Sequence, residues 1–182
     1  KLKKIFFVTL FSCLLPLMGQ AATQQYQDIS LSNRQELRQK FYGSTSINSF
    51  KNVTHAITWI GQQSHQLRNK IPDDRKRREL LRMIHYEATR YQLDPDLVLA
   101  LIEVESGFNR FALSHVGASG LMQVMPFWTK SIGLPEHDLF HLRLNLRYGC
   151  TILRHYLDVE HGDLYRALGR YNGSLGQSQY PQ

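Results

Sequence analysis

Residues 93–106 read LDPDLVLALIEVES, a stretch in which apolar residues recur at helical spacing behind a clear opening signal. Asp94 is suited to cap the first turn, and Pro95 is suited to the first helical position. Asp96 then places a negative charge at the positive end of the helix dipole. We therefore predict a helix that begins after Asp94 and carries one apolar face.

Helical periodicity extends over most of the remaining chain, and no segment shows a convincing alternating strand pattern. We predict further helices over residues 32–42, 53–70, 145–161 and about 163–172, and a long one capped by Asp73 or Asp74. Residues 107–120 are marked as a loop by their glycines, and residues 121–133 as a short helix interrupted by Pro126. The predicted fold class is all-α. It comprises a short N-terminal helical extension and linker over residues 23–71 and a compact helical domain over residues 72–182.

The first 22 residues, KLKKIFFVTLFSCLLPLMGQAA, have the three-part layout of a secretory signal peptide. Three lysines precede an apolar run, and small residues follow it. The apolar run has about 14 residues, whereas a membrane span needs about 20. We expect an exported protein of the periplasm or cell envelope, with a retained membrane anchor as the alternative.

The charge and cysteine content exclude several classes. Removal of residues 1–22 takes three lysines and no acids from a net charge of +7, which leaves +4. No basic stripe is interleaved with aromatic residues, so we expect no nucleic-acid partner. Cys150 is the one cysteine after residue 22, so we expect a buried thiol without a disulfide. His137 and His141 are four apart, but no carboxylate or cysteine completes a ligand set. We predict no metal and no cofactor.

Two glutamates, Glu103 and Glu105, lie near the end of the helix that follows Asp94. With Leu97 at zero and about 100° per residue, Glu105 lies near 80°, inside the apolar arc that we extend to Val104. Glu103 lies near 240°, on the opposite side of the helix. The two carboxyl groups therefore cannot act as a close pair. We expect Glu103 to be a surface or salt-bridging residue.

Glu105 points where core residues belong, and burial disfavours the charged form of a carboxyl group. A carboxyl that stays protonated near neutral pH is suited to general acid catalysis. The alternative is a structural glutamate bonded to an arginine or a backbone amide. The spacing of the residues alone favours neither the catalytic nor the structural interpretation of Glu105.

Three segments in fixed order add to this picture: ESGFN at 105–109, VGASGLMQVMP at 116–126 and RYN at 170–172. In this order and at these distances they resemble the signature of lytic transglycosylases of the soluble-transglycosylase (SLT), goose-lysozyme-like type. The resemblance covers roughly residues 77–174 and implies a lysozyme-like helical domain. It also implies cleavage of peptidoglycan glycan strands between N-acetylmuramic acid and N-acetylglucosamine, with a 1,6-anhydro product.

The resemblance assigns roles residue by residue. Glu105 is the sole catalytic acid and base. Tyr171 holds the catalytic carboxyl through its hydroxyl. The expected substrate-binding residues, which contact the sugar or shape the chain beside it, are Ser106, Gly120, Met122, Gln123, Tyr171 and Asn172. Each also has a structural alternative, such as a helix-end serine for Ser106 or a core methionine for Met122.

The chain departs from the family pattern at Arg170, where a small residue is usual, and at Gly173-Ser174, where Ala-Gly is common. Two other functions therefore stay open. One is a hydrolytic lysozyme of the same fold, which needs a second carboxylate, for which Glu136, Asp138 and Asp163 are candidates. The other is a glycan-binding accessory of the cell wall or of a secretion machine, with a protein partner in the envelope. The sequence gives no oligomeric state.

Overall fold

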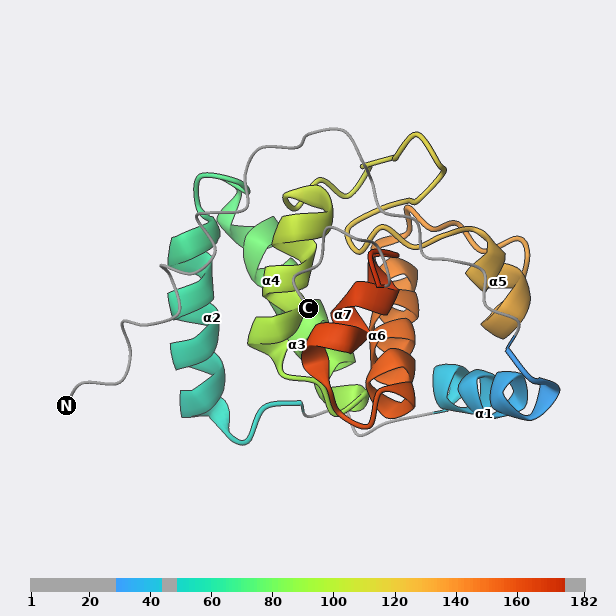
Figure 1. Ribbon diagram of the computed structural model, residues 1–182. Coiled ribbons are helices and arrows are strands. Elements are labelled where there is room, and N and C mark those ends of the chain that lie inside the picture. Colours follow the sequence, from blue (N-terminus) through green and yellow to red (C-terminus); the bar gives the residue numbers. More distant parts are fainter. Residues whose placement is uncertain (1–28, 44–48, 176–182) are drawn as a thin grey trace.

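The computed structural model describes residues 29–43 and 49–175, and these residues form an all-α fold (Figure 1). The predicted fold class is confirmed: in these two ranges no strand is present, and only isolated bridges join Leu113 to Ser119 and Ser119 to Val124. The signal predicted over residues 1–22 lies outside the described ranges. The helices are α1 (Leu31–Tyr42), α2 (Val53–Leu67), α3 (Asp74–Arg90), α4 (Pro95–Ser106), α5 (Phe127–Ile132), α6 (Leu142–Val159) and α7 (Leu164–Tyr171).

Helix starts follow the capping signals of the sequence. The side chains of Asp73, Asp94 and Asp163 each accept a backbone N–H from the first turn, at 3.1, 2.8 and 3.0 Å. Several boundaries differ from the prediction, among them the end of α2, which is at Leu67 instead of residue 70. Residues 121–125 are not helical, because α5 begins only after Pro126. Helix α6 begins at Leu142 instead of residue 145, because His141 acts as its cap.

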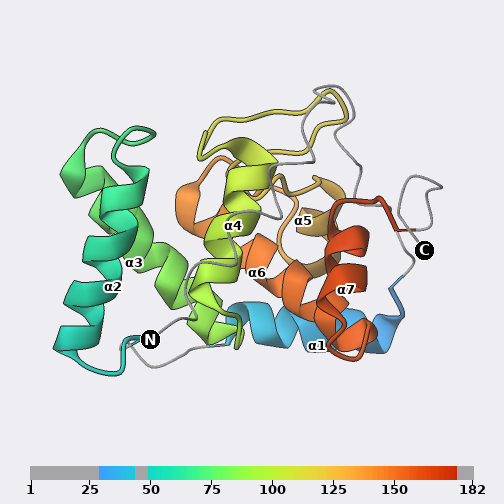
Figure 2. The same cartoon turned by 60° about the vertical axis from the view of Figure 1, so that its left-hand side comes forward.

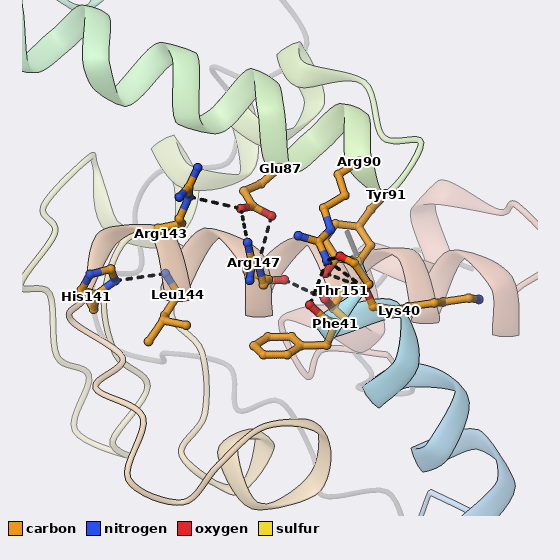
Figure 3. Close-up of polar contacts among 11 residues, drawn as sticks. Lys40, Phe41, Glu87, Arg90, Tyr91, His141, Arg143, Leu144, Arg147 and Thr151 are labelled. Atoms are coloured by element: carbon orange, nitrogen blue, oxygen red, sulfur yellow. Dashed lines mark hydrogen bonds and ion pairs between the residues drawn. The ribbon is translucent and has the colours of Figure 1, made fainter. Parts of the chain in front are cut away.

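Helices α3 and α6 form the centre of the fold. Helix α3 packs against α2, α4 and α6, and α6 also packs against α7 and α1. An ion pair joins the two central helices (Figure 3). The Glu87 carboxylate of α3 is fully buried and accepts from the Arg147 guanidinium of α6 at 3.2 Å. A buried carboxylate without this partner would be costly, so the pair defines how α6 sits against α3.

Helix α1 is tied to the domain at its C-terminal end. The Arg90 guanidinium donates to the Phe41 carbonyl at 2.9 Å and to the Lys40 carbonyl at 3.2 Å (Figure 3). It therefore satisfies carbonyls that a helix end leaves unpaired. The Phe41 ring is buried, with its centroid 4.5 Å from that of Tyr148 on α6.

Helix α2 is also part of the same core. The Trp59 indole donates to Asp96 at the start of α4, at 2.8 Å, and both Trp59 and Ile60 are buried. One hydrophobic core joins buried residues of the described ranges, from Leu37 to Tyr171. The described residues before position 72 therefore pack on the same core as those after it, and the unit boundary at that position stays a sequence-based prediction.

The C-terminal ends of α4 and α7 lie at the same end of the molecule, beneath the loop formed by residues 107–126 (Figures 1 and 2). All three segments of the sequence signature are therefore found at this end. Cys150 is fully buried and free, as expected. In the described ranges, no helix combines the length and apolar character that a membrane crossing requires.

Candidate active site

Glu105 lies in the last turn of α4 and is the penultimate residue of that helix. Gly107 takes the left-handed conformation, with φ of 57°, and its N–H donates to the Glu103 carbonyl at 3.1 Å. Glycine is favoured at such a helix end because it has no Cβ to clash. The following residue, Phe108, is also left-handed, with φ of 68°. The chain thus turns sharply away immediately after Glu105.

The buried face of α4 matches the predicted arc near Glu105 but not at its far edge. Leu101, near 40°, and Val98, near 100°, are buried, and they flank the angle at which Glu105 lies. Val104, which we placed in the same arc, is 58% exposed instead. The Glu105 side chain is half-buried.

Burial raises the pKa of the Glu105 carboxyl from its usual 4.5 to about 7. Loss of solvation is the cause, because the charged form is penalised away from water. Within the described part of the chain, this carboxyl has no hydrogen-bond donor and no cation as a partner. The structural alternative, a glutamate bonded to an arginine or amide, is therefore not what these residues form. Such a group can both give and take a proton near neutral pH.

Glu103 provides a contrast on the same helix. Its side chain is 47% exposed and forms an ion pair with Lys70. This matches the expected surface role. Glu103 also lines a pocket of about 370 Å³ between α2 and α4, together with Asp96, Leu99 and Phe108. Glu105 does not line this pocket, which lies on the other side of α4.

The loop formed by residues 107–126 folds back on itself as a short antiparallel turn. The Ser119 N–H donates to the Val124 carbonyl and the Val124 N–H to the Ser119 carbonyl, both at 3.0 Å. Gly120 has a φ of 78°, and a Cβ there would come within 2.4 Å of the Asn145 side-chain nitrogen. Gly120 therefore allows both the backbone turn and the close approach to α6. The backbone turn and the close approach support a structural role of Gly120 in the site.

Gln123 is held by the loop through its amide nitrogen. This nitrogen donates to the carbonyls of Ala112 at 3.2 Å and Gly120 at 3.0 Å. Both partners are acceptors, so the amide orientation is fixed. No donor among the described residues bonds to the amide oxygen, which is therefore the atom left to accept from a ligand. Gln123 has a φ of 47°, a conformation that costs roughly 1 kcal/mol and is often kept at functional sites.

Met122 is part of the core and does not line a groove. Its side chain has no exposed surface, and a Cβ at Gly149 of α6 would come within 2.3 Å of its sulfur. The prediction that the Met122 side chain contacts substrate is therefore wrong in this structure. Its backbone has a different part: the N–H donates to Asn145 at 2.8 Å, and the carbonyl accepts from Tyr171 at 2.7 Å.

Tyr171 connects the end of α7 to the loop. Its hydroxyl is buried and donates to the Met122 carbonyl. A phenol has one proton, so this hydroxyl does not donate to Glu105, and that part of the prediction is wrong in this structure. The effect of Tyr171 is to fix the backbone of the residue before Gln123.

Asn172 and Ser106 end their helices. The Asn172 side-chain oxygen accepts the Ser174 backbone N–H at 3.0 Å, while no described residue accepts from its side-chain nitrogen. Asn172 thus caps a turn with one atom and retains donors for a ligand with the other. The Ser106 hydroxyl donates to the Ile102 carbonyl at 3.2 Å, as a helix-end serine commonly does.

Asn145 is a residue of the site that the sequence analysis missed. It is buried, and its side-chain nitrogen donates to the carbonyls of Ser119 at 2.8 Å and Leu139 at 2.9 Å. Its oxygen accepts the Met122 N–H. One side chain therefore fixes both arms of the loop next to Gln123. The only signal in the sequence was a polar amide on the apolar face of a helix, which needs partners when buried.

Arg170, the residue that departs from the family pattern, is engaged elsewhere. Its guanidinium pairs with Glu160 near the C-terminal end of α6, as does that of Arg166. The side-chain hydrogen bonds of these arginines hold the pKa of the Glu160 carboxyl below its usual range. Among the described residues, no group of three or more histidine, cysteine, aspartate or glutamate side chains could hold a metal ion.

Comparisons with known proteins identify one family. The family described as transglycosylase SLT domain matches residues 82–181, more than half of the chain. A transglycosylase of Enterobacteria phage PRD1 is 38% identical over 93 residues, 51% of this chain and 34% of that protein. Membrane-bound lytic murein transglycosylase C of Glaesserella parasuis is 43% identical over 115 residues, 54% of this chain and 32% of that protein. The corresponding protein of Cronobacter sakazakii is 29% identical over 126 residues, 59% of this chain and 35% of that protein.

The chain spans about a third of the length of these curated relatives. No solved structure matches it.

Proposed function

Because the chain belongs to the transglycosylase SLT domain family, we propose that it is a peptidoglycan lytic transglycosylase with Glu105 as its only acid and base. The substrate is the glycan strand, cut at the β-1,4 bond between N-acetylmuramic acid and N-acetylglucosamine. The observation that carries the proposal is the half-buried Glu105 carboxyl with a pKa of about 7 and no partner among the described residues.

The reaction needs one carboxyl group in two protonation states. Protonated Glu105 donates its proton to the bridging oxygen while the glycosidic bond breaks through an oxocarbenium-like state. The carboxylate that remains takes the proton of the C6 hydroxyl of the same muramic acid. That oxygen closes on the anomeric carbon and forms the 1,6-anhydro ring. The carboxyl ends protonated, so it is ready for the next cycle.

Other side chains bind and orient the sugar. The Gln123 amide oxygen accepts from an N-acetyl N–H or a hydroxyl, since its nitrogen is already used inside the loop. The Asn172 side-chain nitrogen donates to a substrate oxygen. Tyr171 and Asn145 are positioning residues, because they act on the backbone that carries Gln123 and do not touch the sugar.

Hydrolysis on the same fold is less well supported. An inverting mechanism needs a second carboxylate that activates water across the sugar. Asp163 caps the opposite end of α7 from Tyr171, and Asp138 accepts the Phe140 N–H at 2.8 Å in a turn. Glu136 is exposed. All three candidates are exposed, whereas Glu105 is half-buried.

Mass spectrometry of products from purified cell-wall sacculi tests the proposal. We expect 1,6-anhydro sugar ends, one water lighter than the reducing ends that a lysozyme leaves. Glu105→Gln should release no product. Glu103→Gln is the matched control, because it changes the same residue type on the opposite face of α4, and it should stay active. Reducing ends, or activity in Glu105→Gln, would overturn the mechanism. Sacculus binding without any product would favour the glycan-binding accessory.

We further propose export to the periplasm or cell envelope. The basic and apolar first 22 residues support it, as does the location of the substrate. Two of the relatives named above are described as membrane-bound.

A further inference from the structure

Two histidines from different helices meet between α2 and α3, which pack side by side (Figure 2). His85 of α3 is only 4% exposed, and its ring centroid lies 5.8 Å from that of His55 on α2. The Trp59 ring of α2 also contacts His85, with the two centroids 4.9 Å apart. Histidine is the side chain whose charge ordinarily changes between pH 5 and 8. The contact between the two helices therefore includes a group that acid can charge.

The segment before α2 is attached to the same ring. Phe50 stacks on His85, with the ring centroids 3.6 Å apart and an interplanar angle of 20°. The Ser49 hydroxyl and the His85 Nδ1 atom share a hydrogen bond of 3.0 Å. One imidazole therefore joins three parts of the chain: the segment before α2, α2 itself and α3. We refer to Ser49, Phe50, His55, Trp59 and His85 as the His85 cluster.

The surroundings of His85 provide no counter-charge. Among the described residues, no carboxylate bonds to either imidazole, and the titratable group that faces His85 is His55. The neutral Thr89 hydroxyl of α3 lies 3.4 Å from the His85 Nδ1 atom, and the buried His55 Nδ1 atom has no partner in the described part of the chain. Burial and, to a smaller extent, the His55 ring lower the pKa of His85 from 6.5 to about 4. The closed cluster therefore favours a neutral His85.

We propose that the His85 cluster is an acid-sensitive latch, in which protonation of His85 releases the segment before α2 and the N-terminal half of α2 from α3. The C-terminal half of α2 has a separate attachment, because Arg77 of α3 donates to the Ser64 hydroxyl at 2.7 Å. The latch also bears on the helix that carries Glu105. The Trp59 indole donates to Asp96 in the first turn of α4 at 2.8 Å, so an open latch would loosen the support of that helix.

The pH dependence follows from the difference between the closed and the open latch. The His85 pKa is about 4 when the latch is closed, and it returns to its usual 6.5 when the ring reaches water. The open form therefore binds the proton first, and the stability of the closed form is lost as pH falls from 6.5 towards 4. Between pH 7.5 and pH 5 we expect opening to become roughly 30-fold more frequent.

Hydrogen exchange of backbone amides in the full chain measures this opening, after correction for the intrinsic effect of pH on exchange. Amides in the first turns of α2 should lose protection at pH 5, whereas those of α6 should stay protected, because the rest of the fold remains closed. His85→Gln and His85→Phe should remove the response to pH. Gln can still bond to the Ser49 hydroxyl, and Phe can still stack on Phe50. His65→Gln is the matched control, because His65 is an exposed histidine in the last turn of the same helix. It should leave the response unchanged.

Proton NMR of the His85 ring, assigned by its absence in His85→Gln, gives a second measurement that does not depend on how stable the variants are. We expect the ring to titrate near pH 4. A ring that titrates near 6.5 would overturn the latch. A response to pH that both His85 variants keep would also overturn it, as would loss of protection in α6 together with α2. None of these measurements uses a substrate, so the latch and the proposed function can fail independently.

Discussion

The Glu105 carboxyl destabilises the folded chain when it is ionised, and the ionised form is the one that accepts a proton in the reaction. Its pKa is raised from 4.5 to about 7, so the folded chain holds this proton after the unfolded chain has lost it. Between these two values the unfolded state binds fewer protons, and stability falls as pH rises. Below pH 4.5 both states are protonated, and the residue costs nothing by this route.

Glu105→Gln should therefore stabilise the fold while it abolishes activity. At pH 8 we expect a gain of roughly 3 kcal/mol in the free energy of unfolding, because the pKa rises from 4.5 to about 7 and each pKa unit corresponds to about 1.4 kcal/mol. At pH 4 the gain should vanish. Urea unfolding at both pH values measures this, with Glu103→Gln as the control. The same gain at both pH values would show that the carboxyl is not desolvated.

Tyr171→Phe distinguishes a positioning role of the Tyr171 hydroxyl from a direct contact of this hydroxyl with Glu105. Removal of the hydroxyl leaves the Met122 carbonyl without its donor and should cost about 1–3 kcal/mol of stability. Activity should fall, because the backbone before Gln123 is no longer fixed. The pH at which activity is half-maximal should not move, since Tyr171 does not donate to Glu105. A shifted pH profile would contradict this.

At this scale the sequence predicted the partial burial of Glu105 but not its surroundings. A helical wheel finds a carboxyl on an apolar face, because helix geometry is local. It cannot find where the Tyr171 hydroxyl bonds, because the choice between Met122 and Glu105 depends on a few ångströms in the packing of the loop against α7. Asn145 was missed for the same reason: its three partners lie in residues 119–139, and only the fold brings them together.

Among the elements, the loop formed by residues 107–126 depends on one glycine more than on the others. Gly120→Ala should cost about 3 kcal/mol or more, because it adds a left-handed penalty and a Cβ within 2.4 Å of the Asn145 side chain. Gly162→Ala is the control: its φ is 87°, but the space around it is open. It should cost only about 1 kcal/mol. Equal losses in thermal unfolding would show that the contact with Asn145 does not constrain the loop.

The helices were more predictable than this loop, for a physical reason. Caps such as Asp73 and Asp94 act within one turn, so their effect can be read from neighbouring residues. Residues 121–125 look apolar enough for a helix, but their backbone bonds go to the opposite arm of the loop and to α6. Tertiary contacts decide whether such a segment is helical.

At the scale of the whole molecule, α1 and α2 belong to the same hydrophobic core as the helices after residue 72. The sequence separated them because residues 43–52 are small and polar, which is typical of a linker. A linker sequence does not tell whether the flanking helices pack on the same core. The buried Phe41 ring against Tyr148 and the Arg90 bonds to the end of α1 could not be inferred from local pattern.

Phe41→Ala tests whether α1 is integral to the fold. The ring is 1% exposed, so its removal should cost about 3–5 kcal/mol and leave a cavity beside Tyr148. Tyr42→Ala, at a neighbouring position that is 50% exposed, should cost less than about 1 kcal/mol. Urea unfolding should show one transition in both variants. A separate early transition, or a small effect of Phe41→Ala, would mean that α1 is a detachable extension.

The ionisation of Glu105 is the property on which the proposed chemistry depends most directly. Carbon-13 NMR of glutamate side chains can follow its carboxyl resonance through a pH titration, with assignment by its absence in Glu105→Gln. We predict a resonance that titrates near pH 7, in line with the raised pKa. A Glu105 resonance that titrates near 4.5, like an exposed glutamate, would contradict the account, because the group could then not deliver a proton at neutral pH.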